Sequence, residues 1–407
     1  MKKIFAILAI LIVFSSFAFA DENMPRVTVP TTAQGGFGGP HIAYTDNVYS
    51  LLVNPAAMIR VNERTFFNLN PSLVNPQSTF TLIDSLLNIS PDKIDDLVDV
   101  LSKGNIGIGL ELKEFPLSFG WVANGFGFAL FNNTFLNVSI LGTEVFATVY
   151  EDIMLPIGFG FKILETPSHS IDAGLTLKPF ARLYAKERLG LLKAVSSIVN
   201  GDMGDLIDGI NTPLMTGASL DIGLLYRWDI GFSAGMTFND IYSRGTVIRN
   251  FTNEDNESGT FVVPFTWNLG VAYEFRPGNF WPGLPAILSR SGLTFAFDWR
   301  DFGNAQKLDD YLQRNPALDI GMGIQLSLID TFIFRVGMNE CLPAVGLGFD
   351  LGAFKLDIAY YGKELGNEPG QNSVAVLELS MAVRPGAKER DWPWARKSLL
   401  SAFGIGQ

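Results

Sequence analysis

The sequence predicts an all-β fold, a transmembrane antiparallel β-barrel of about 14 strands, with an N-terminal hatch that plugs the lumen and with helical extracellular loops. Three observations predict it. Hydrophobic residues make up 47% of the 407 residues, and the mean hydropathy is positive. After residue 20, no apolar run reaches the roughly 18 residues that a transmembrane helix needs. Apolar and polar residues alternate instead along many long segments, and an irregular glycine-rich stretch precedes them.

Residues 1–20 have the features of a cleaved signal peptide. Lys2 and Lys3 form a positive start, an apolar core follows, and Ala18-Phe19-Ala20 matches a cleavage site. An uncleaved anchor helix is the alternative, although the core is short for a membrane span. Cleavage would remove two of the 30 basic residues and none of the 41 acidic ones. The remaining acidic balance argues against a nucleic-acid partner, which needs basic patches.

The stretch from Gln34 to Phe67 contains the predicted hatch and its junction with the barrel. Its glycine run disfavours both a regular helix and a central strand. Asn54-Pro55 is a helix-start signal, with Asn54 as the cap and Pro55 as the first helical residue. We place the hatch at residues 21–63, the barrel at 64–383 and a C-terminal tail at 384–407. The predicted hatch residues are Gly35, Gly36, Gly38, Gly39, Asn54, Pro55 and Ala56.

Alternation with a period of two predicts the strands of the barrel wall. From Leu220 to Trp228, large apolar residues occupy every second position. Asn124-Gly125 separates two such segments and predicts a tight hairpin turn. Merging two weak candidates gives about 14 strands, an even number as expected of a bacterial barrel. The candidates are 65–70, 105–113, 116–123, 126–135, 153–163, 171–185, 220–228, 230–239, 265–276, 293–300, 318–326, 331–338, 345–351, 354–361 and 374–383.

Other segments break the strand pattern. Asp84–Lys103, Lys186–Leu214 and Asp301–Pro316 have helical spacing, and the first two carry an apolar stripe. Gly245–Gly259 is predicted to be a charged loop. Short turns at one end and long, partly helical connections at the other are typical of a membrane barrel, whose long loops lie outside the cell.

A soluble β-sandwich would show the same alternation, so other features must decide between water and lipid. Several predicted strands exceed the roughly 9–11 residues of a tilted membrane strand, and aromatic residues gather near the ends of their apolar faces. An arginine facing the lipid midplane costs roughly 2–4 kcal/mol. Arg227, Arg300 and Arg335 all fall on the polar faces of their strands. These features favour a barrel in the bacterial outer membrane, with a soluble secreted β protein as the rival.

The sequence contains no recognisable catalytic constellation. The two histidines, His41 and His169, are far apart, and no metalloprotease, P-loop or nucleophile-elbow motif occurs. We expect a non-enzyme with no catalytic residues, no cofactor and no metal. Metal ligation by His41 with Asp46 is conceivable, but a polar histidine within the hatch is favoured. Cys341 is the only cysteine, so an intrachain disulfide is impossible, and we expect its side chain to be buried.

Charged residues on the polar faces are candidates for lining the lumen. Both signs occur in similar number, which favours internal salt bridges that hold a plug over a selective ion pore. Some of these charges could instead bind a ligand headgroup, with arginine or lysine meeting a carboxylate. The predicted lumen-lining residues are Asp221, Arg227, Asp298, Arg300, Arg335 and Asp357.

The glycine run, Ala43, Asp46 and the Asn54-Pro55-Ala56 turn before Arg64-Thr65-Phe66 resemble the N-terminal hatch of the FadL family. These are outer-membrane channels for long-chain fatty acids and other hydrophobic compounds. The resemblance implies a 14-stranded barrel, a lumen hatch and passive uptake, with fatty acids or other apolar small molecules and outer-membrane lipid as partners of a monomer. The ligand would leave when the hatch shifts or through a lateral gap.

The segment from Leu293 to Met381 also resembles the related PorV-type barrels. That resemblance implies a second hypothesis, a non-transporting outer-membrane scaffold that binds exported proteins. Ala57 stands where PorV-like relatives often carry glycine, which slightly favours transport. The last predicted strand does not end the chain in an aromatic residue, as it does in many such barrels, and the role of the tail is open.

Overall fold

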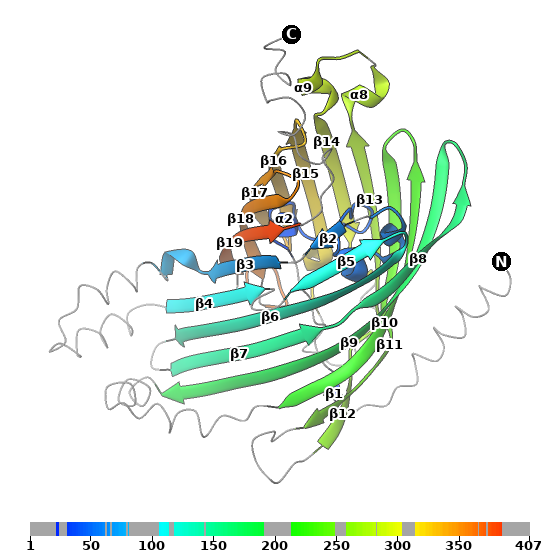
Figure 1. The fold of residues 1–407 in the computed structure, drawn as a ribbon. Coiled ribbons are helices and arrows are strands. Elements are labelled where there is room, and N and C mark those ends of the chain that lie inside the picture. Colours follow the sequence, from blue (N-terminus) through cyan, green and yellow to red (C-terminus); the bar gives the residue numbers. More distant parts are fainter. Residues whose placement is uncertain are drawn as a thin grey trace.

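The structure is a computed structural model, and the wall of its fold is a closed antiparallel β-barrel (Figure 1). None of the helices among the described residues is long and apolar enough to cross a membrane. The structure describes residues 22–23, 31–61, 63–65, 67–78, 80, 106–113, 118–141, 144–190, 213–248, 258–281, 283–302, 314–364, 366–371 and 373–384.

The described helices are short and the strands are long. The helices are α2 (Thr32–Gly36), α3 (Ser50–Val53), η1 (Pro55–Ile59), α8 (Pro277–Phe280), α9 (Ala286–Ser289) and η3 (Pro316–Asp319). The strands are β1 (Glu22–Asn23), β2 (Glu63–Thr65), β3 (Phe67–Val74), β4 (Ile106–Lys113), β5 (Phe119–Ala123), β6 (Phe126–Leu141), β7 (Glu144–Met154), β8 (Ile157–Glu165), β9 (His169–Gly190), β10 (Leu214–Trp228), β11 (Phe232–Ile248), β12 (Ser258–Val262), β13 (Thr266–Phe275), β14 (Gly292–Trp299), β15 (Ile320–Leu328), β16 (Phe332–Asn339), β17 (Leu342–Asp350), β18 (Phe354–Glu364) and β19 (Ser373–Val383).

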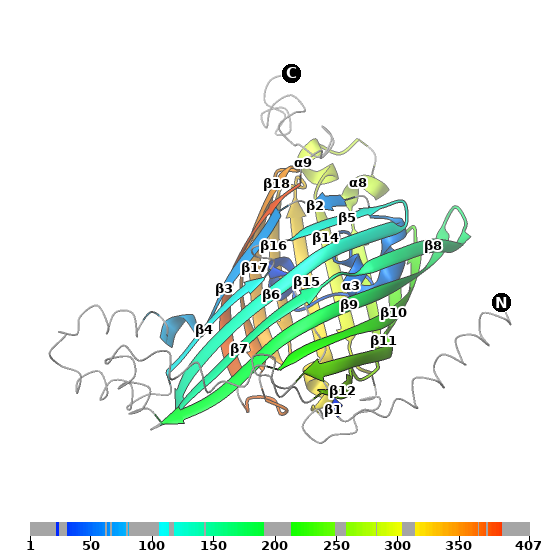
Figure 2. The same cartoon turned by 60° about the horizontal axis from the view of Figure 1, so that its bottom comes forward.

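These strands form a wall of 14 strands, which confirms the predicted fold class. Four wall strands each comprise two segments, β2/β3, β4/β5, β7/β8 and β12/β13. The residues between β2 and β3 and between β4 and β5 lie outside the described ranges. The two halves of β7/β8, for example, pair with β9 in one continuous register, Met154 with Phe180 and Ile157 with Leu177. The barrel closes where β19 pairs with β3. Figure 2 shows the strands tilted around the barrel.

The predicted hairpin at Asn124-Gly125 is confirmed. It connects β5 to β6, and both residues have positive φ angles, 52° and 81°. Such angles fit the right-handed twist of the flanking strands, and Asn and Gly adopt them at low cost. The turn lies at the end of the barrel that also holds the start of β2 and the end of β19. We call this the short-turn end and the opposite one the long-loop end.

The predicted alternation of faces is present in the wall. On β15, Met322, Ile324 and Leu326 point outward and are 39–45% exposed, whereas the intervening Gln325 is buried. Large apolar side chains on the outside recur around the wall. A contiguous apolar surface of this extent belongs in lipid, because soluble monomers rarely expose more than a few hundred Å² of it.

Several predicted loops are partly wrong. The helix predicted at Lys186–Leu214 is wrong at both ends. Residues 186–190 continue β9, because they pair in register with β7. Leu214 already belongs to β10. Gly245–Ile248 pairs with Ser258–Phe261, so the loop predicted at Gly245–Gly259 is strand at both ends. Asp84–Lys103, residues 191–212 and most of Asp301–Pro316 lie outside the described residues. Helical loops thus stay a prediction.

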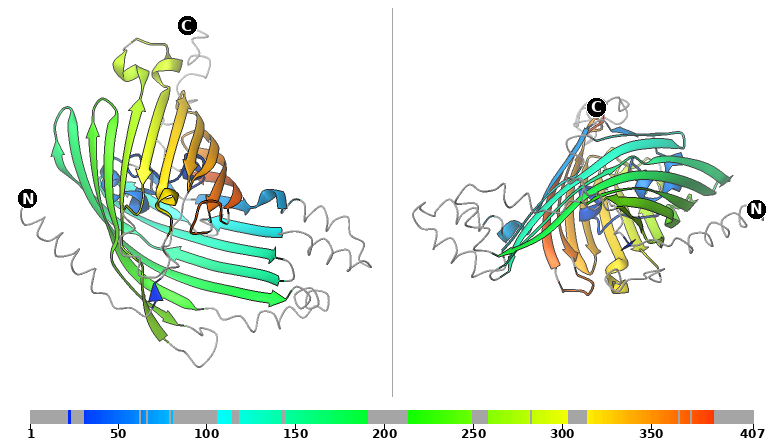
Figure 3. Two further views of the ribbon diagram at one scale, coloured as in Figure 1. Left: turned by 180° about the vertical axis from the view of Figure 1, so that it is seen from behind. Right: turned by 90° about the horizontal axis from the view of Figure 1, so that it is seen from below.

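Residues 31–61, which we call the luminal segment, lie inside the barrel. In Figures 1 and 3 α2, α3 and η1 are surrounded by wall strands, and β1 lies outside them beside β12. The segment packs α2 against β16 to β19 and η1 against β8 to β10, on opposite sides of the wall. It therefore spans the lumen.

Candidate functional site in the barrel lumen

The luminal segment begins with a self-contained cap. The Thr31 hydroxyl accepts a hydrogen bond from the Gln34 amide at 3.1 Å, and the Gln34 side chain accepts one from the Thr31 amide at 3.0 Å. This capping box starts α2 at a defined residue. The helix ends at Gly36 with Phe37 as its C-cap, and Gly38 and Gly39 follow, whose φ angles of 90° and 107° turn the chain away. Residues with a Cβ rarely adopt such angles.

Glycines on the inward face of the wall let the segment touch strand backbones. A Cβ at Gly174 would overlap the backbone of Pro55, and one at Gly323 would overlap the carbonyl of Phe37. Gly346 lies against Gly36 in the same way, where a Cβ would come within 3.0 Å. The inward glycines of the alternation are thus explained by close backbone approach.

His41 fixes the middle of the segment to β14. Its Nδ1 is hydrogen-bonded to the Asp298 carboxylate, and its Nε2 lies 3.0 Å from the carbonyl oxygen of Phe37. The other oxygen of Asp298 accepts the Ile42 amide at 2.7 Å. The side chains of His41 and Asp298 are 2% and 1% exposed. A buried pair with so many bonds is costly to break on one side.

Asn54 fixes the next turn. Its side-chain oxygen accepts the Ala56 amide at 3.1 Å and caps η1, as the Asn-Pro signal predicts. Its side-chain nitrogen donates to the carbonyls of Ile42 at 2.9 Å and Leu224 at 3.2 Å. Asn54 is fully buried. It therefore ties two parts of the luminal segment to β10 as well as capping its own helix.

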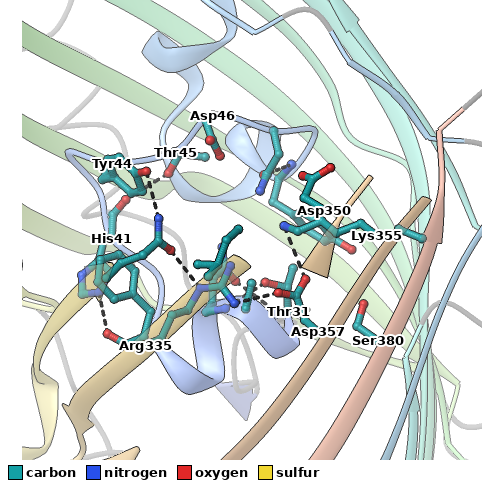
Figure 4. Close-up of a pocket in the computed structure, with 18 of the residues that line it drawn as sticks. Thr31, His41, Tyr44, Thr45, Asp46, Arg335, Asp350, Lys355, Asp357 and Ser380 are labelled. Atoms are coloured by element: carbon teal, nitrogen blue, oxygen red, sulfur yellow. Dashed lines mark hydrogen bonds and ion pairs between the residues drawn. The ribbon is translucent and has the colours of Figure 1, made fainter. Parts of the chain in front are cut away.

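A polar cavity of about 170 Å³ lies between the segment and the wall toward the short-turn end (Figure 4). Residues of both signs line it: Glu63, Asp46, Asp350, Asp357, Arg335, Lys355 and Arg384. Tyr44 and Gln325 also line it, and the Gln325 side chain donates to the Tyr44 hydroxyl at 3.2 Å. Burial raises the pKa of Tyr44, and the negative charge of Asp46 raises it further. The Tyr44 hydroxyl therefore stays protonated.

The cations of this cavity are paired. Arg335 donates to Asp357 at 2.6 Å and to Gln325 at 2.9 Å, and Lys355 lies 3.4 Å from Asp357. Arg384 bonds to Asp350. In Figure 4 Lys355 and Arg335 approach Asp357 from two sides. The cavity therefore has four acidic and three basic side chains in its lining, and each of the three cations is paired with a carboxylate. An apolar molecule gains nothing by entering such a polar space.

The long-loop half of the lumen carries apolar side chains instead. One buried cluster joins Met154, Phe180, Val247, Phe261 and Val263, with Met215 and Leu52 packed against it. A second joins Val74, Phe135, Ala344, Ala359, Tyr361, Val374 and Val376, with Tyr150 beside it. Phe135 and Tyr150 stack at 4.8 Å between ring centres. The luminal segment separates these clusters from the polar cavity.

Ion pairs also cross the inner face of the wall. Lys113 on β4 donates to Glu378 on β19 at 3.0 Å, over the intervening strand β3, and both side chains are fully buried. Lys178 binds Asp221 at 2.8 Å and Asp240 at 2.9 Å. These pairs hold neighbouring strands together from within.

Asn68 on β3 makes a different kind of contact with the neighbouring strand. Among the described residues, which exclude 66 and 114–117, main-chain pairing is found from Val74 to Asn70 on β3 and again at Thr65 on β2. Between these positions the Ser118 hydroxyl accepts the Asn68 amide at 3.2 Å and donates to the Asn68 carbonyl at 3.1 Å. A side chain thus satisfies both main-chain groups of Asn68.

The structure places the predicted residues as follows. Gly35, Gly36, Gly38, Gly39, Asn54, Pro55 and Ala56 lie in the luminal segment, and Asp221, Asp298, Arg335 and Asp357 are buried on the inward face. Arg300 bonds to Asn339 beside Gly39. Arg227 is half-buried, and among the described residues it makes no ion pair. Only Arg335 and Asp357 of the predicted lumen set meet each other.

Sequence reasoning missed several contacts. It considered Asp46 beside His41 and missed Asp298, and it did not connect Lys113 with Glu378. Nothing local in a sequence shows which residues pair. A polar residue at an inward-facing strand position does indicate that a buried partner is needed. The expectation that Cys341 is buried is wrong: it is exposed in the β16–β17 turn, where its thiol donates to the Ala317 carbonyl at 3.3 Å.

No protein-family model and no curated protein matches the chain. Solved structures do match it. The toluene transporter TodX of Pseudomonas putida is 12% identical with a TM-score of 0.46, covering 89% of this chain and 99% of that one. A FadL homologue of Pseudomonas aeruginosa is 13% identical with a TM-score of 0.45, covering 88% and 99%. The CymD monoaromatic hydrocarbon channel is 12% identical with a TM-score of 0.44, covering 89% and 99%.

All three TM-scores are below 0.5. The fold assignment therefore rests on the strand register of this chain.

Proposed function

We propose that the chain is an outer-membrane channel for the passive uptake of hydrophobic compounds, such as long-chain fatty acids. The observation that carries the proposal is the division of the lumen. Apolar clusters line its long-loop half, a charged cavity occupies the short-turn half, and the luminal segment lies between them. An apolar molecule is held in the first compartment and disfavoured in the second.

In this proposal the luminal segment acts as the hatch, within residues 21–63, and the tail 384–407 follows the barrel. A ligand that enters from the long-loop end binds against the apolar clusters, where burial of its surface supplies the affinity. It then leaves by a shift of the hatch or sideways. The stretch around Asn68 and Ser118 is the candidate for a sideways exit, because a serine hydroxyl bonds to both main-chain groups of Asn68 there.

Uptake into lipid vesicles tests the channel. Purified protein reconstituted into vesicles should accelerate the entry of labelled fatty acid over protein-free vesicles, and extracts of the purified protein should contain apolar ligand. A folded barrel that repeatedly carries no ligand and gives no uptake would end the proposal. Retained binding of exported proteins by that same preparation would support the scaffold function that the PorV-type resemblance implies.

A further inference from the structure

One connection at the short-turn end differs from the rest. The other described connections there, such as Asn124–Gly125, Ile329–Thr331 and Leu351–Ala353, have two or three residues. The connection from β13 to β14 runs from Arg276 to Ser291 and contains α8 and α9. Figures 1 and 2 both show it standing beyond the ends of these strands. A turn would suffice to join the strands, so the extra length needs another explanation.

This connection, which we call the α8–α9 loop, exposes large apolar side chains. Phe280 and Trp281 are 43% and 57% exposed, and Ile287 and Leu288 are 38% and 50% exposed. Phe280 stacks on Phe275 at 5.5 Å, and Trp281 meets Phe275 edge-on at 6.0 Å. Phe275 is the last residue of β13 and continues the outward row of Val271 and Tyr273. The aromatic side of the loop is thus continuous with the lipid-facing surface.

The charged side chains of the loop pair with residues on β13 and in the β15–β16 turn. Arg276 pairs with Glu274 and lies 3.2 Å from Asp330, and Arg290 also lies 3.2 Å from Asp330. The Asp330 amide donates to the Arg290 carbonyl at 3.1 Å. These contacts connect the loop to the β15–β16 turn. The loop is therefore amphipathic, with its charged side chains paired and its apolar ones exposed.

We propose that the α8–α9 loop is a membrane-interface anchor that inserts Phe280, Trp281, Ile287 and Leu288 into the phospholipid leaflet at the short-turn end. Tryptophan and phenylalanine favour this interface, where an apolar body and a polar rim meet. Below the loop, a groove of about 530 Å³ runs over Tyr273, Phe295, Ile324 and Val336 on the outer wall. Its lining is apolar, which suits a lipid acyl chain lying beneath the anchor.

Fluorescent labels can locate the loop in a membrane. In a Cys341→Ser background, the Trp281→Cys and Leu288→Cys proteins are labelled with an environment-sensitive dye and reconstituted into phosphatidylcholine vesicles. Both labels should emit at shorter wavelength than a control label at Asp229→Cys, in the exposed β10–β11 turn of the same end. Phospholipids with quenchers on the upper acyl chain should quench both, and aqueous iodide should quench only the control.

Two results would overturn the anchor. If iodide reaches the labels at 281 and 288 as readily as the one at 229, the loop stands in water and its apolar side is free for a protein partner. If lipid quenchers reach only one of the two labels, the apolar side chains of both helices cannot all be inserted in the membrane. Heat-modifiable migration in electrophoresis shows whether each variant forms a folded barrel. If one of the two cysteine variants does not fold, the other still tests the proposal. The readout involves no transport, so it stands apart from the channel proposal.

Discussion

At the scale of single residues, the lumen is held by few polar contacts of long sequence separation. His41 and Asp298 are the clearest pair, since both are buried and each makes a second hydrogen bond within the luminal segment. Sequence reasoning predicted that His41 is a polar residue of a hatch and that Asp298 faces the lumen. It could not pair them, because nothing periodic links positions so far apart in the chain.

Replacing His41 by alanine should loosen the luminal segment. The Asp298 carboxylate would remain buried without its partner, a loss of about 3–5 kcal/mol for a fully buried pair. Swelling of vesicles in small sugars should show faster entry through the His41→Ala barrel. The matched control is His169→Ala, because that histidine is exposed and bonds only locally to Tyr226 at 2.9 Å. Equal permeability of the two variants would show that the pair does not hold the segment.

The Lys113–Glu378 pair should behave as a coupled unit. Lys113→Met leaves the buried Glu378 and Glu111 without their shared cation, and Glu378→Gln leaves Lys113 with only Glu111 at 3.8 Å. Each single change should lower the free energy of unfolding by about 3–5 kcal/mol. The double variant should lose clearly less free energy of unfolding than the sum of the losses in the two single variants. Urea titration of all four proteins measures the coupling. Lys162→Met breaks the exposed pair with Glu165, 42% and 48% exposed, and should leave the free energy of unfolding nearly unchanged, because solvent screens such pairs. Additive losses at 113 and 378 would contradict the coupling.

At the scale of elements, alternation was a sound guide to strands and a poor guide to their ends. It located β10, β13, β15 and β18, whose outward faces are apolar. It failed at residues 186–190, since Leu189 fits a helical stripe as well as a strand face. Pairing with β7 decided the outcome there, and pairing partners are not visible in one segment alone. The same reason explains the strand ends inside the loop predicted at Gly245–Gly259.

The contact between η1 and β9 should be sensitive to one methyl group. A Cβ at Gly174 would overlap Pro55, so Gly174→Ala must displace the luminal segment or distort the strand. We expect a loss of about 1–3 kcal/mol, as for other overpacked interiors. Thermal unfolding of the detergent-purified barrel measures it. Gly190→Ala on the same strand is the control, since a Cβ there meets nothing within 4 Å. An unchanged melting temperature at 174 would mean that η1 does not press on this wall.

At the scale of the whole molecule, the barrel wall encloses the luminal segment, and the proposed function depends on this segment. The fold class was predictable because composition, alternation and the absence of long apolar runs all agree. The glycine run and the Asn54 cap also marked the segment that now lies inside the wall. Its docking could not be predicted, since each contact depends on strands that come much later in the sequence.

Deleting Pro40–Val53 should open the lumen. The deletion removes His41 and Tyr49, so the remaining segment loses its bonds to Asp298 on β14 and to Asn68 on β3. Planar-bilayer conductance should rise above that of the complete barrel. Heat-modifiable migration must first show that the shortened chain still folds. A folded barrel of unchanged conductance would mean that the segment is not a plug, and the hatch would have to be sought elsewhere.

The seam between β3 and β19 has a consequence for assembly. It joins the first and the last wall strands, Phe67–Val74 with Val376–Val383, so the barrel cannot close until β19 has been exported. Contacts between residues so far apart in the sequence make folding slow. Closure of this seam is therefore the last pairing step of the wall, and a chain stalled before β19 should stay open and accessible to protease.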